Sequence, residues 1–165
     1  MKELVVADSS PLITLLNIGR FDLLGKLFTH IIVPPMVAEE VGCGEADSSI
    51  WFAMQQSGFI RIATLQADKR LPVLLLQIDP GESEAILLAD QLKQPLLIDD
   101  KAGRKMAQMM GLRITGLVGI LEALQKKGAL SAEQMPGILD DLEKVEFRLS
   151  AALKQRLLEG RRSNA

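Results

Sequence analysis

Short apolar runs alternate with longer segments of helical periodicity along this chain of 165 residues. The short runs are rich in Val, Ile and Leu and are predicted to be strands, at residues 4–7, 30–33, 59–62, 95–98 and 112–115. Segments with a helical pattern lie between and after them, at residues 11–18, 21–28, 36–41, 44–57, 82–93, 102–110, 116–127, 131–142 and 150–158. Strands that alternate with helices predict an α/β fold in which helices cover both faces of a parallel sheet.

The first predicted strand ends at a carboxylate. Its apolar run stops at Asp8, and the segment Ser9-Ser10-Pro11 predicts that a helix begins near its proline. Asp8 therefore stands at the carboxyl end of a central strand, which is where ligands bind in open α/β sheets. The simpler alternative is that Asp8 only caps the helix. Residues 66–77 give no clear pattern, and Pro72 excludes a long helix there.

Composition narrows the chemistry that this chain can perform. A hydrophobic content of 48% over 165 residues predicts one domain with a full core. The net charge of -2 argues against non-specific coating of nucleic acid. With Cys43 and His30 as the single residues of their types, a disulfide framework, a zinc site and a Ser-His-Asp triad are all disfavoured. There is no signal-peptide pattern and no apolar run long enough to span a bilayer, so a cytoplasmic protein without membrane contact is expected.

Carboxylates recur at the ends of the predicted strands and on the helices beside them. Asp8 follows the first strand, and Asp99 and Asp100 follow the fourth. Because parallel strands bring their carboxyl ends to one edge of the sheet, these acids are expected to share that edge. The helix after Asp79 adds Glu82 and Glu84, which flank its core stripe from opposite sides, so helical geometry alone does not choose between them.

A further pair, Glu39 and Glu40, lies on the helix that follows Pro34-Pro35. Several carboxylates on one edge of the sheet repel one another, so the pKa of at least one of them is predicted to be raised. The same repulsion predicts that a hard cation binds there and neutralises the charges. Oxygen ligands suit Mg²⁺ or Mn²⁺. An acidic cluster without His or Cys fits metal-assisted phosphodiester hydrolysis.

Four motifs in this order resemble those of a PIN domain. They are Val6-Ala7-Asp8-Ser9-Ser10, Val33-Pro34-Pro35-Met36-Val37-Ala38-Glu39-Glu40-Val41, Gly81-Glu82-Ser83-Glu84-Ala85-Ile86 and Ile98-Asp99-Asp100-Lys101-Ala102-Gly103-Arg104. The last two are especially similar to the VapC-like branch of that family. The resemblance implies a three-layer α/β/α sandwich with a five-stranded parallel sheet in the order 3-2-1-4-5. It places the PIN-like catalytic domain in residues 1–130 and leaves residues 131–165 as a helical extension of the same domain.

The resemblance also implies an activity and its residues. It implies a Mg²⁺- or Mn²⁺-dependent endoribonuclease that cleaves single-stranded RNA, the toxin of a toxin–antitoxin pair, with an antitoxin protein and a second copy of the chain as partners. The positions that match the family's catalytic and metal-binding acids are Asp8, Glu40, Glu84 and Asp100, with Asp99 and Glu82 as rival metal ligands. Ser9 or Ser10 matches a supporting hydroxyl. From the sequence itself, Lys101 and Arg104 are candidates for contact with RNA phosphates.

Two other functions compete with this hypothesis. The chain could keep the fold as a catalytically silent protein-interaction module, which the presence of acids at all four positions argues against. A phosphatase-type enzyme with Asp8 as nucleophile would want a second Asp shortly after it, and Ser10 stands there instead. The last predicted helix has an apolar side, including Leu153, Leu157 and Leu158, which predicts a docking or oligomerisation role.

Overall fold

A parallel sheet forms the centre of the molecule. The computed structural model describes residues 3–44 and 48–160. The five strands lie in the order β3-β2-β1-β4-β5, and each neighbouring pair is parallel. Their bounds are β1 Glu3–Ala7, β2 Phe28–Val33, β3 Ile60–Ile62, β4 Leu96–Leu97 and β5 Ile114–Thr115. The predicted α/β class, the parallel sheet and the strand order 3-2-1-4-5 are confirmed.

Burial explains why the central strands are almost purely apolar. Val6 of β1 pairs with Ile32 of β2 on one side and with Leu96 of β4 on the other. Val6 and Leu96 are fully buried, as expected for strands covered on both faces. At the edge of the sheet, Ile62 of β3 is 53% exposed. The middle of the sheet is therefore a rigid support for whatever follows β1 and β4.

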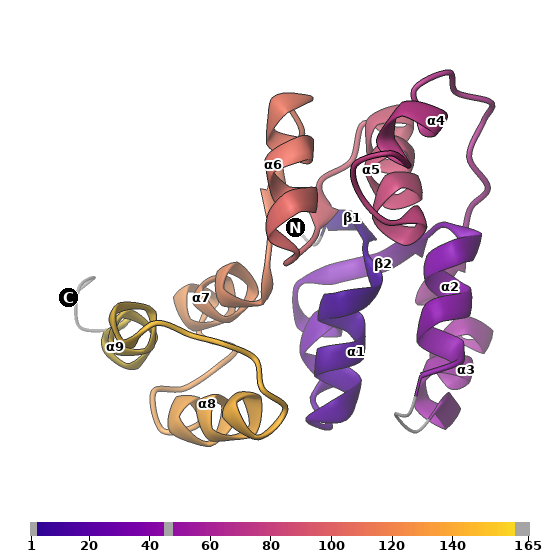
Figure 1. Cartoon of the computed structure of the whole chain (residues 1–165). Helices are drawn as coiled ribbons and strands as arrows, with labels where there is room; N and C mark the ends of the chain where they lie inside the picture. The colour runs from indigo at the N-terminus through magenta and orange to yellow at the C-terminus, as the bar shows by residue number, and fades with distance from the viewer. Residues whose placement is uncertain (1–2, 45–47, 161–165) are drawn as a thin grey trace.

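Helices cover both faces of this sheet. Figure 1 shows α5 (Pro80–Leu92) and α6 (Lys101–Met109) on one side, and α1 (Ser9–Asn17) and α7 (Leu117–Lys127) on the other. The helices α2 (Pro35–Gly42) and α3 (Ser48–Gln56) connect β2 to β3. This arrangement is the predicted three-layer sandwich. Among the helices of the described residues, none has the length and apolar character needed to cross a membrane.

Several element boundaries differ from the predicted ones. Residues 21–28 do not form one α-helix. A 3₁₀ helix, η1 (Phe21–Lys26), covers most of this segment, and β2 already begins at Phe28. The helix expected from Pro11 starts at Ser9, because Asp8 has an extended backbone and takes the N-cap position. The segment 66–77 contains a short helix, α4 (Leu71–Leu74), with its proline in the first turn. Of the helix predicted at 44–57, residues 45–47 lie outside the described residues.

The last two helices pack against each other, and the second of them also packs against α7. They are α8 (Met135–Lys144) and α9 (Ala151–Glu159), and α8 starts later than predicted because Pro136 is accommodated in its first turn. Leu157 of α9 is fully buried, and its carbonyl accepts a hydrogen bond of 2.7 Å from Gln125 Nε2 of α7. Leu153 is half-buried, whereas Ala152 and Leu158 are exposed, Leu158 at 46%. The apolar side of α9 is thus partly covered by its own chain, and its docking or oligomerisation role stays a prediction.

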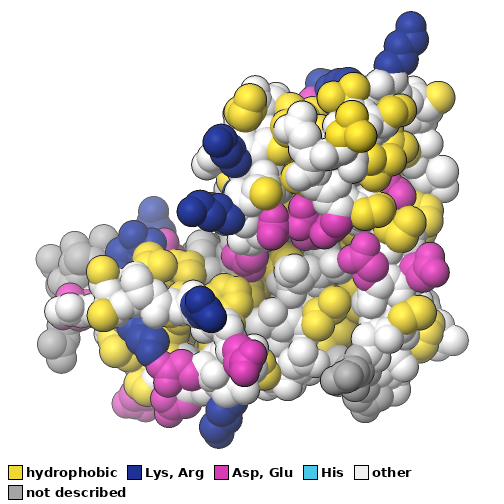
Figure 2. Space-filling model, viewed as in Figure 1, with side chains coloured by type: hydrophobic (Ala, Val, Ile, Leu, Met, Phe, Trp, Pro, Cys, Tyr) yellow, Lys and Arg dark blue, Asp and Glu magenta, His cyan; other side chains and the backbone are white. Residues whose placement is uncertain are grey.

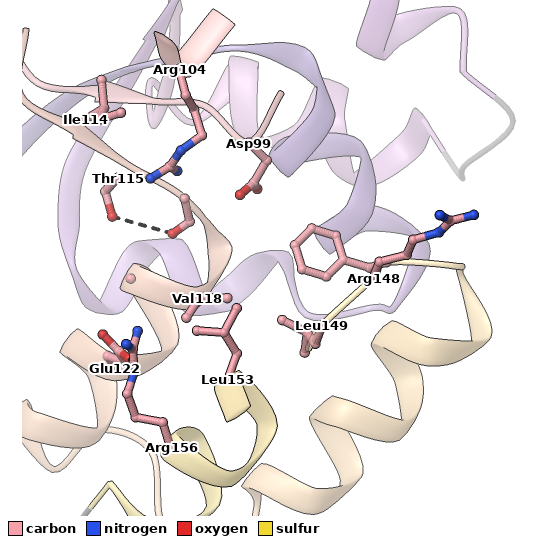
Figure 3. Close-up of a pocket in the computed structure, with 13 residues that line it drawn as sticks. Asp99, Arg104, Ile114, Thr115, Val118, Glu122, Arg148, Leu149, Leu153 and Arg156 are labelled. Carbon is pink, nitrogen blue, oxygen red and sulfur yellow. Dashed lines mark hydrogen bonds and ion pairs between the residues drawn. The ribbon is translucent and has the colours of Figure 1, made fainter. Parts of the chain in front are cut away.

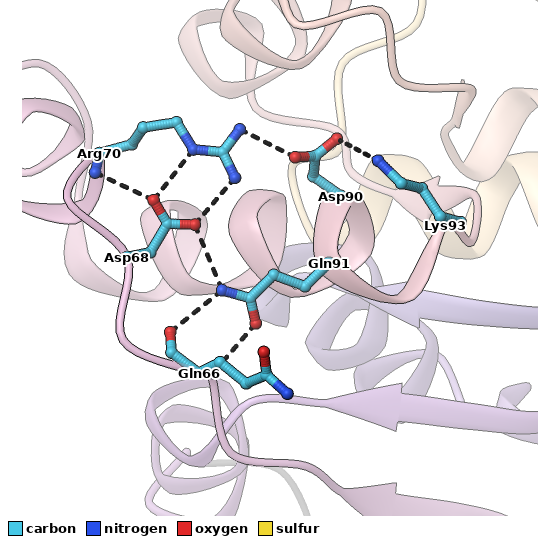
Figure 4. A network of polar contacts seen from close by, with 6 residues as sticks. All are labelled: Gln66, Asp68, Arg70, Asp90, Gln91 and Lys93. Carbon is cyan, nitrogen blue, oxygen red and sulfur yellow. Dashed lines mark hydrogen bonds and ion pairs between the residues drawn. The ribbon is translucent and has the colours of Figure 1, made fainter.

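A polar network holds the long connection before α5 against that helix (Figure 4). Arg70 binds Asp68 through Nε and Nη2 and reaches Asp90 of α5 through Nη1 at 2.8 Å. The side chain of Gln91 exchanges two hydrogen bonds with the backbone of Gln66. The Arg70 guanidinium holds the pKa of the Asp68 carboxyl well below its usual range. These contacts therefore hold the segment against α5, the helix that also carries Glu82.

Candidate active site

Three aspartates occupy the N-cap positions of the helices that begin at one edge of the sheet. They are Asp8 before α1, Asp79 before α5 and Asp100 before α6. Because a helix N-terminus carries a partial positive charge, it is a favourable place for a carboxylate. Together with Glu40 and Glu82 they form what is here called the acidic cluster. Figure 2 shows acidic side chains gathered across the middle of this face, below the part of the molecule formed by α5 and α6.

Asp8 is the most enclosed member of the cluster. Its exposed fraction is 1%, and its side chain makes no capping hydrogen bond to α1. Oδ1 has no hydrogen-bond partner among the described residues. Burial raises the pKa of Asp8 to about 7; the Ser9 backbone N–H opposes this, while the charges of Asp79, Glu40 and Asp100 add to it. A buried carboxylate with an unused oxygen is a poor helix cap and a good candidate ligand for a cation.

Glu82 joins Asp8, and Glu84 does not. Glu82 is 7% exposed, and its pKa is raised to about 8, first by burial and then by the charges of Asp79, Asp100 and Asp8. Glu84 is half-buried, and the largest charge effects on Asp8 and Glu82 come from other acids. Two residues along a helix turn a side chain by about 200° around the axis, so the two glutamates face different surroundings.

Gly103 of α6 makes room for Glu82. A Cβ at this position would lie 2.6 Å from Ile98 Cδ1 and 3.5 Å from the Glu82 carboxylate. The absence of a side chain therefore lets α6 approach both the sheet and Glu82. The backbone N–H of Gly103 also donates to Asp100 Oδ2 at 2.9 Å, which fixes that carboxylate at the start of α6.

Ser9 connects Glu40 to the first helix. Ser9 Oγ donates a hydrogen bond of 2.6 Å to Glu40 Oε2, and Ser9 is buried. The other oxygen of Glu40 packs against Gly81, where a Cβ would overlap it. Ser10 is exposed, and its backbone carbonyl serves Thr14 instead. Of the two serines that the sequence left open, the structure brings Ser9 to the acidic cluster.

Asp99 lies apart from its neighbour Asp100. Both of its carboxylate oxygens accept from the backbone N–H of Leu117 at 3.2 Å, so Asp99 caps α7, whose own N-cap residue is Gly116. Burial raises the pKa of Asp99, and the Leu117 N–H and the Arg104 charge oppose this rise. Gly116 is required here, because a Cβ would overlap the Asp99 carboxylate and the Arg104 guanidinium.

The two predicted RNA-binding residues occupy different surroundings. Lys101 is exposed on the first turn of α6, directly after Asp100. Arg104 is half-buried, donates from Nη1 to the Ile98 carbonyl at 3.0 Å, and faces the side of Asp99 (Figure 3). Basic side chains border the acidic ones beside α6 in Figure 2. Positive charge is therefore available next to the cluster, on α6.

Asp79 is a member of the cluster that the sequence pattern indicated only as a helix cap. Its Oδ1 accepts from the Glu82 backbone N–H at 2.8 Å, and its charge acts on both Asp8 and Glu82. The signal was present in the spacing: an N-cap residue and the residue three positions later share one turn and bring their side chains together. Asp79 and Glu82 stand at this spacing.

The acidic cluster offers carboxylate oxygens, the type of ligand that hard divalent cations prefer. Within the described residues, no group of three or more His, Cys, Asp or Glu side chains is arranged to hold a metal ion as it stands. Three of the other acids make local hydrogen bonds instead: Glu40 with Ser9, Asp79 with the Glu82 backbone N–H, and Asp100 with Gly103. The unpaired Oδ1 of Asp8 and the mutual repulsion of the cluster still favour a divalent cation, provided that side chains turn toward it.

The comparisons with known proteins agree with this geometry. A family model described as a PIN domain matches residues 4–162, nearly the whole chain and beyond residue 130. A solved structure, the PilT N-terminus domain protein SSO1118 from the hyperthermophilic archaeon Sulfolobus solfataricus P2, is similar with a TM-score of 0.52 and 15% sequence identity. The similarity covers 73% of this chain and 92% of that one. No curated protein matches. The chain belongs to the PIN-domain family, whose members are usually nucleases that use divalent metal ions.

Proposed function

We propose that this protein is a Mg²⁺- or Mn²⁺-dependent endoribonuclease that hydrolyses single-stranded RNA at the acidic cluster. The observation that supports this most is Asp8, a 1% exposed carboxylate with an unpaired oxygen among four other acids. Such a group is unfavourable for folding unless it serves a ligand. The family to which the chain belongs makes nuclease chemistry the natural use of that ligand.

Four side chains of the cluster would hold the cation: Asp8, Glu40, Glu82 and Asp100. When bound, a divalent cation supplies Lewis-acid polarisation of a phosphate oxygen and a water of lowered pKa. Ser9 keeps the Glu40 carboxylate turned toward the start of α1 through its 2.6 Å hydrogen bond. The N-termini of α1, α5 and α6 offset part of the repulsion among the acids.

The substrate follows from the charges around the cluster. Bare carboxylates repel the phosphates of RNA, so the strand needs cationic groups beside them. Lys101 is exposed on α6 immediately after Asp100, where it is suited to bind a phosphate of a strand that crosses the cluster. Single-stranded rather than double-stranded RNA is the proposed substrate, since unpaired bases can be turned away from the backbone into protein pockets.

We further propose that the chain belongs to the VapC-like branch and acts as the toxin of a toxin–antitoxin pair, as a homodimer with an antitoxin protein as partner. The Gly-Glu-Ser-Glu-Ala-Ile segment at 81–86 and the Ile-Asp-Asp segment at 98–100 support this assignment. Expression of the native chain should arrest growth of the host cell, and Asp8→Asn should not. Coexpression with a small protein encoded directly beside it should restore growth and give a complex by size-exclusion chromatography.

The decisive test of the active site compares two glutamates of one helix. Purified protein is incubated with a fluorescent single-stranded RNA oligonucleotide and Mn²⁺, with and without EDTA. Glu82→Gln should abolish cleavage, whereas Glu84→Gln should cleave like the native protein. Loss of activity in Glu84→Gln alone would show that the cluster described above is not the active site. No cleavage of any RNA or DNA by the native protein would favour the silent interaction module.

A further inference from the structure

A pocket of about 490 Å³ lies beside the acidic cluster, between the start of α7 and the last helix. Its wall is formed by residues from β5, α6, α7 and the segment around α9, among them Asp99, Arg104, Val118, Phe147, Leu153 and Arg156. Figure 3 shows Arg104 and Asp99 on one side of it and Val118 and Leu153 facing them from below. The volume lies in the usual range for a small-molecule site.

The lining combines apolar side chains with charged ones. Phe147 and Leu153 are half-buried, so part of each surface is open to the pocket. Among the charged residues, Arg156 Nε binds Glu122 Oε1 at 2.5 Å, and Arg104 is anchored to the Ile98 carbonyl. Aromatic and arginine side chains are the groups on which proteins stack unpaired bases.

Phe147 is positioned by an uncommon turn. Glu146, directly before it, has a φ of 60°, in the left-handed region that non-glycine residues rarely adopt. The turn is closed by hydrogen bonds of 3.0 Å from Glu146 N to Glu143 O and from Phe147 N to Leu142 O. A glycine would relieve this turn at the end of α8. The chain thus turns sharply after α8, immediately before the residue that enters the pocket wall.

The pocket wall includes the residue next to Asp100 in the chain. Asp99 lines the pocket and Asp100 belongs to the cluster, and the Cα atoms of consecutive residues lie only about 3.8 Å apart. Arg104, on the pocket wall, donates its backbone N–H to the Asp100 carbonyl at 2.8 Å. One wall residue of the pocket and one acid of the cluster are therefore neighbours, so a strand whose phosphate lies at the cluster has only a short way to extend before a neighbouring nucleotide reaches the pocket.

We infer that this pocket takes the unpaired base of a nucleotide that flanks the scissile phosphate. The inference rests on the proposed function. The apolar wall with Phe147 receives the face of the base, and Arg104 and Arg156 supply positive charge near the phosphate–sugar strand. Arg148 directs its guanidinium outward from the pocket (Figure 3), on the side where the strand would leave it. The helix α9, whose Leu153 completes the wall, thereby becomes part of the substrate site.

The test removes one base at a time from the substrate and needs no variant of the protein. A single-stranded RNA that the native protein cleaves with Mn²⁺ at one mapped bond is resynthesised with an abasic nucleotide at each position in turn. An abasic nucleotide at one position directly flanking the bond should lower kcat/KM about tenfold, as expected for loss of a stacked base. Equal cleavage of all abasic substrates would overturn the inference and leave the nuclease itself intact. No cleavage of the parent RNA would refute the proposed function instead.

A variant pair then assigns the effect to the pocket. Phe147→Ala should lower kcat/KM about tenfold on the parent RNA and leave it unchanged on the sensitive abasic substrate. Phe52→Ala, which removes a 51% exposed phenylalanine from α3, should change neither value. If Phe147→Ala weakened both substrates equally, the base would not be in this pocket. If it weakened only the binding of a partner protein, the pocket would be a protein-docking site and the inference would be wrong.

Discussion

Replacement of Asp8 by Asn should stabilise the metal-free protein at high pH and leave it unchanged at low pH. The pKa of Asp8 is about 7 in the folded chain against an ordinary value of 3.8. Between these two values the folded state binds the proton more tightly than the unfolded state, so the free energy of unfolding falls as pH rises. The destabilisation of the folded state by the Asp8 charge is absent at pH values below about 4 and complete above about 8. Asn keeps the shape of the side chain and carries no charge at any pH.

The size of the effect follows from the shift. A change from 3.8 to about 7 corresponds to about 4 kcal/mol, at about 1.4 kcal/mol per pKa unit. For a chain of this size, about 1 kcal/mol changes the melting temperature by roughly 2–4 °C. Asp8→Asn should therefore raise the melting temperature by roughly 8–16 °C at pH 8 in EDTA. Loss of the Asp8 charge also removes one of the charges that raise the pKa of Glu82, which acts in the same direction.

Metal should narrow the stability gap between the native protein and Asp8→Asn. A cation that binds only the folded cluster stabilises it by about 2.7 kcal/mol at a hundredfold excess over its dissociation constant. Mn²⁺ should raise the melting temperature of the native protein at pH 8 and leave that of Asp8→Asn almost unchanged.

The assay is a set of thermal melts at pH 4 and pH 8, with EDTA or Mn²⁺. Asp140→Asn, which changes an exposed acid on α8, serves as the control and should behave like the native protein. Equal Mn²⁺ shifts in native protein and Asp8→Asn would show that the cation binds elsewhere. A gap between the two metal-free proteins that is as large at pH 4 as at pH 8 would refute the assignment of the effect to the charge of Asp8.

Three further predictions test the fold around the site. Arg70→Ala should lower the melting temperature slightly, with a larger effect at low salt than at high salt, because the exposed ion pairs it removes are screened. Leu157→Ala should destabilise the chain by about 2–5 kcal/mol in urea unfolding, while Leu158→Ala should have little effect, since only Leu157 is fully buried. Gly103→Ala should reduce both stability and RNA cleavage through its clash with the sheet, whereas Gly25→Ala, with nothing near its Cβ, should keep full cleavage.

Much of the fold could be predicted from alternation alone. The five strands are short apolar runs that no helix pattern interrupts, and burial on both faces explains why β1 and β4 contain no polar residue between Leu4 and Ala7 or at Leu96 and Leu97. The boundaries that were wrong depend on backbone detail. Whether residues 21–28 form one helix or a 3₁₀ turn followed by a strand depends on pairing with β1, which no local pattern records.

The location of the candidate site in the fold could be predicted from the sequence, but its exact set of residues could not. Parallel strands bring Asp8 and Asp100 to the same edge whatever the details of packing. The choice between Glu82 and Glu84 depends on how α5 is rotated against the sheet, and the sequence fixes only the angle between the two side chains. The cause of the raised pKa values also differs from the expected one: repulsion contributes, but burial is the larger cause for both Asp8 and Glu82.

The pair Asp99 and Asp100 shows why two identical residues can have separate tasks. Both follow β4, but α7 begins at Gly116, which offers no side chain to cap it, and Asp99 supplies that cap from the neighbouring strand end. Asp100 is left to begin α6, and its charge acts on Asp8. Because Asp99 is fixed at the start of α7, it also fixes one wall of the pocket that α9 completes. A single peptide bond therefore joins a wall residue of the pocket to an acid of the cluster, so a change that freed Asp99 should disturb the pocket before it disturbed the cluster.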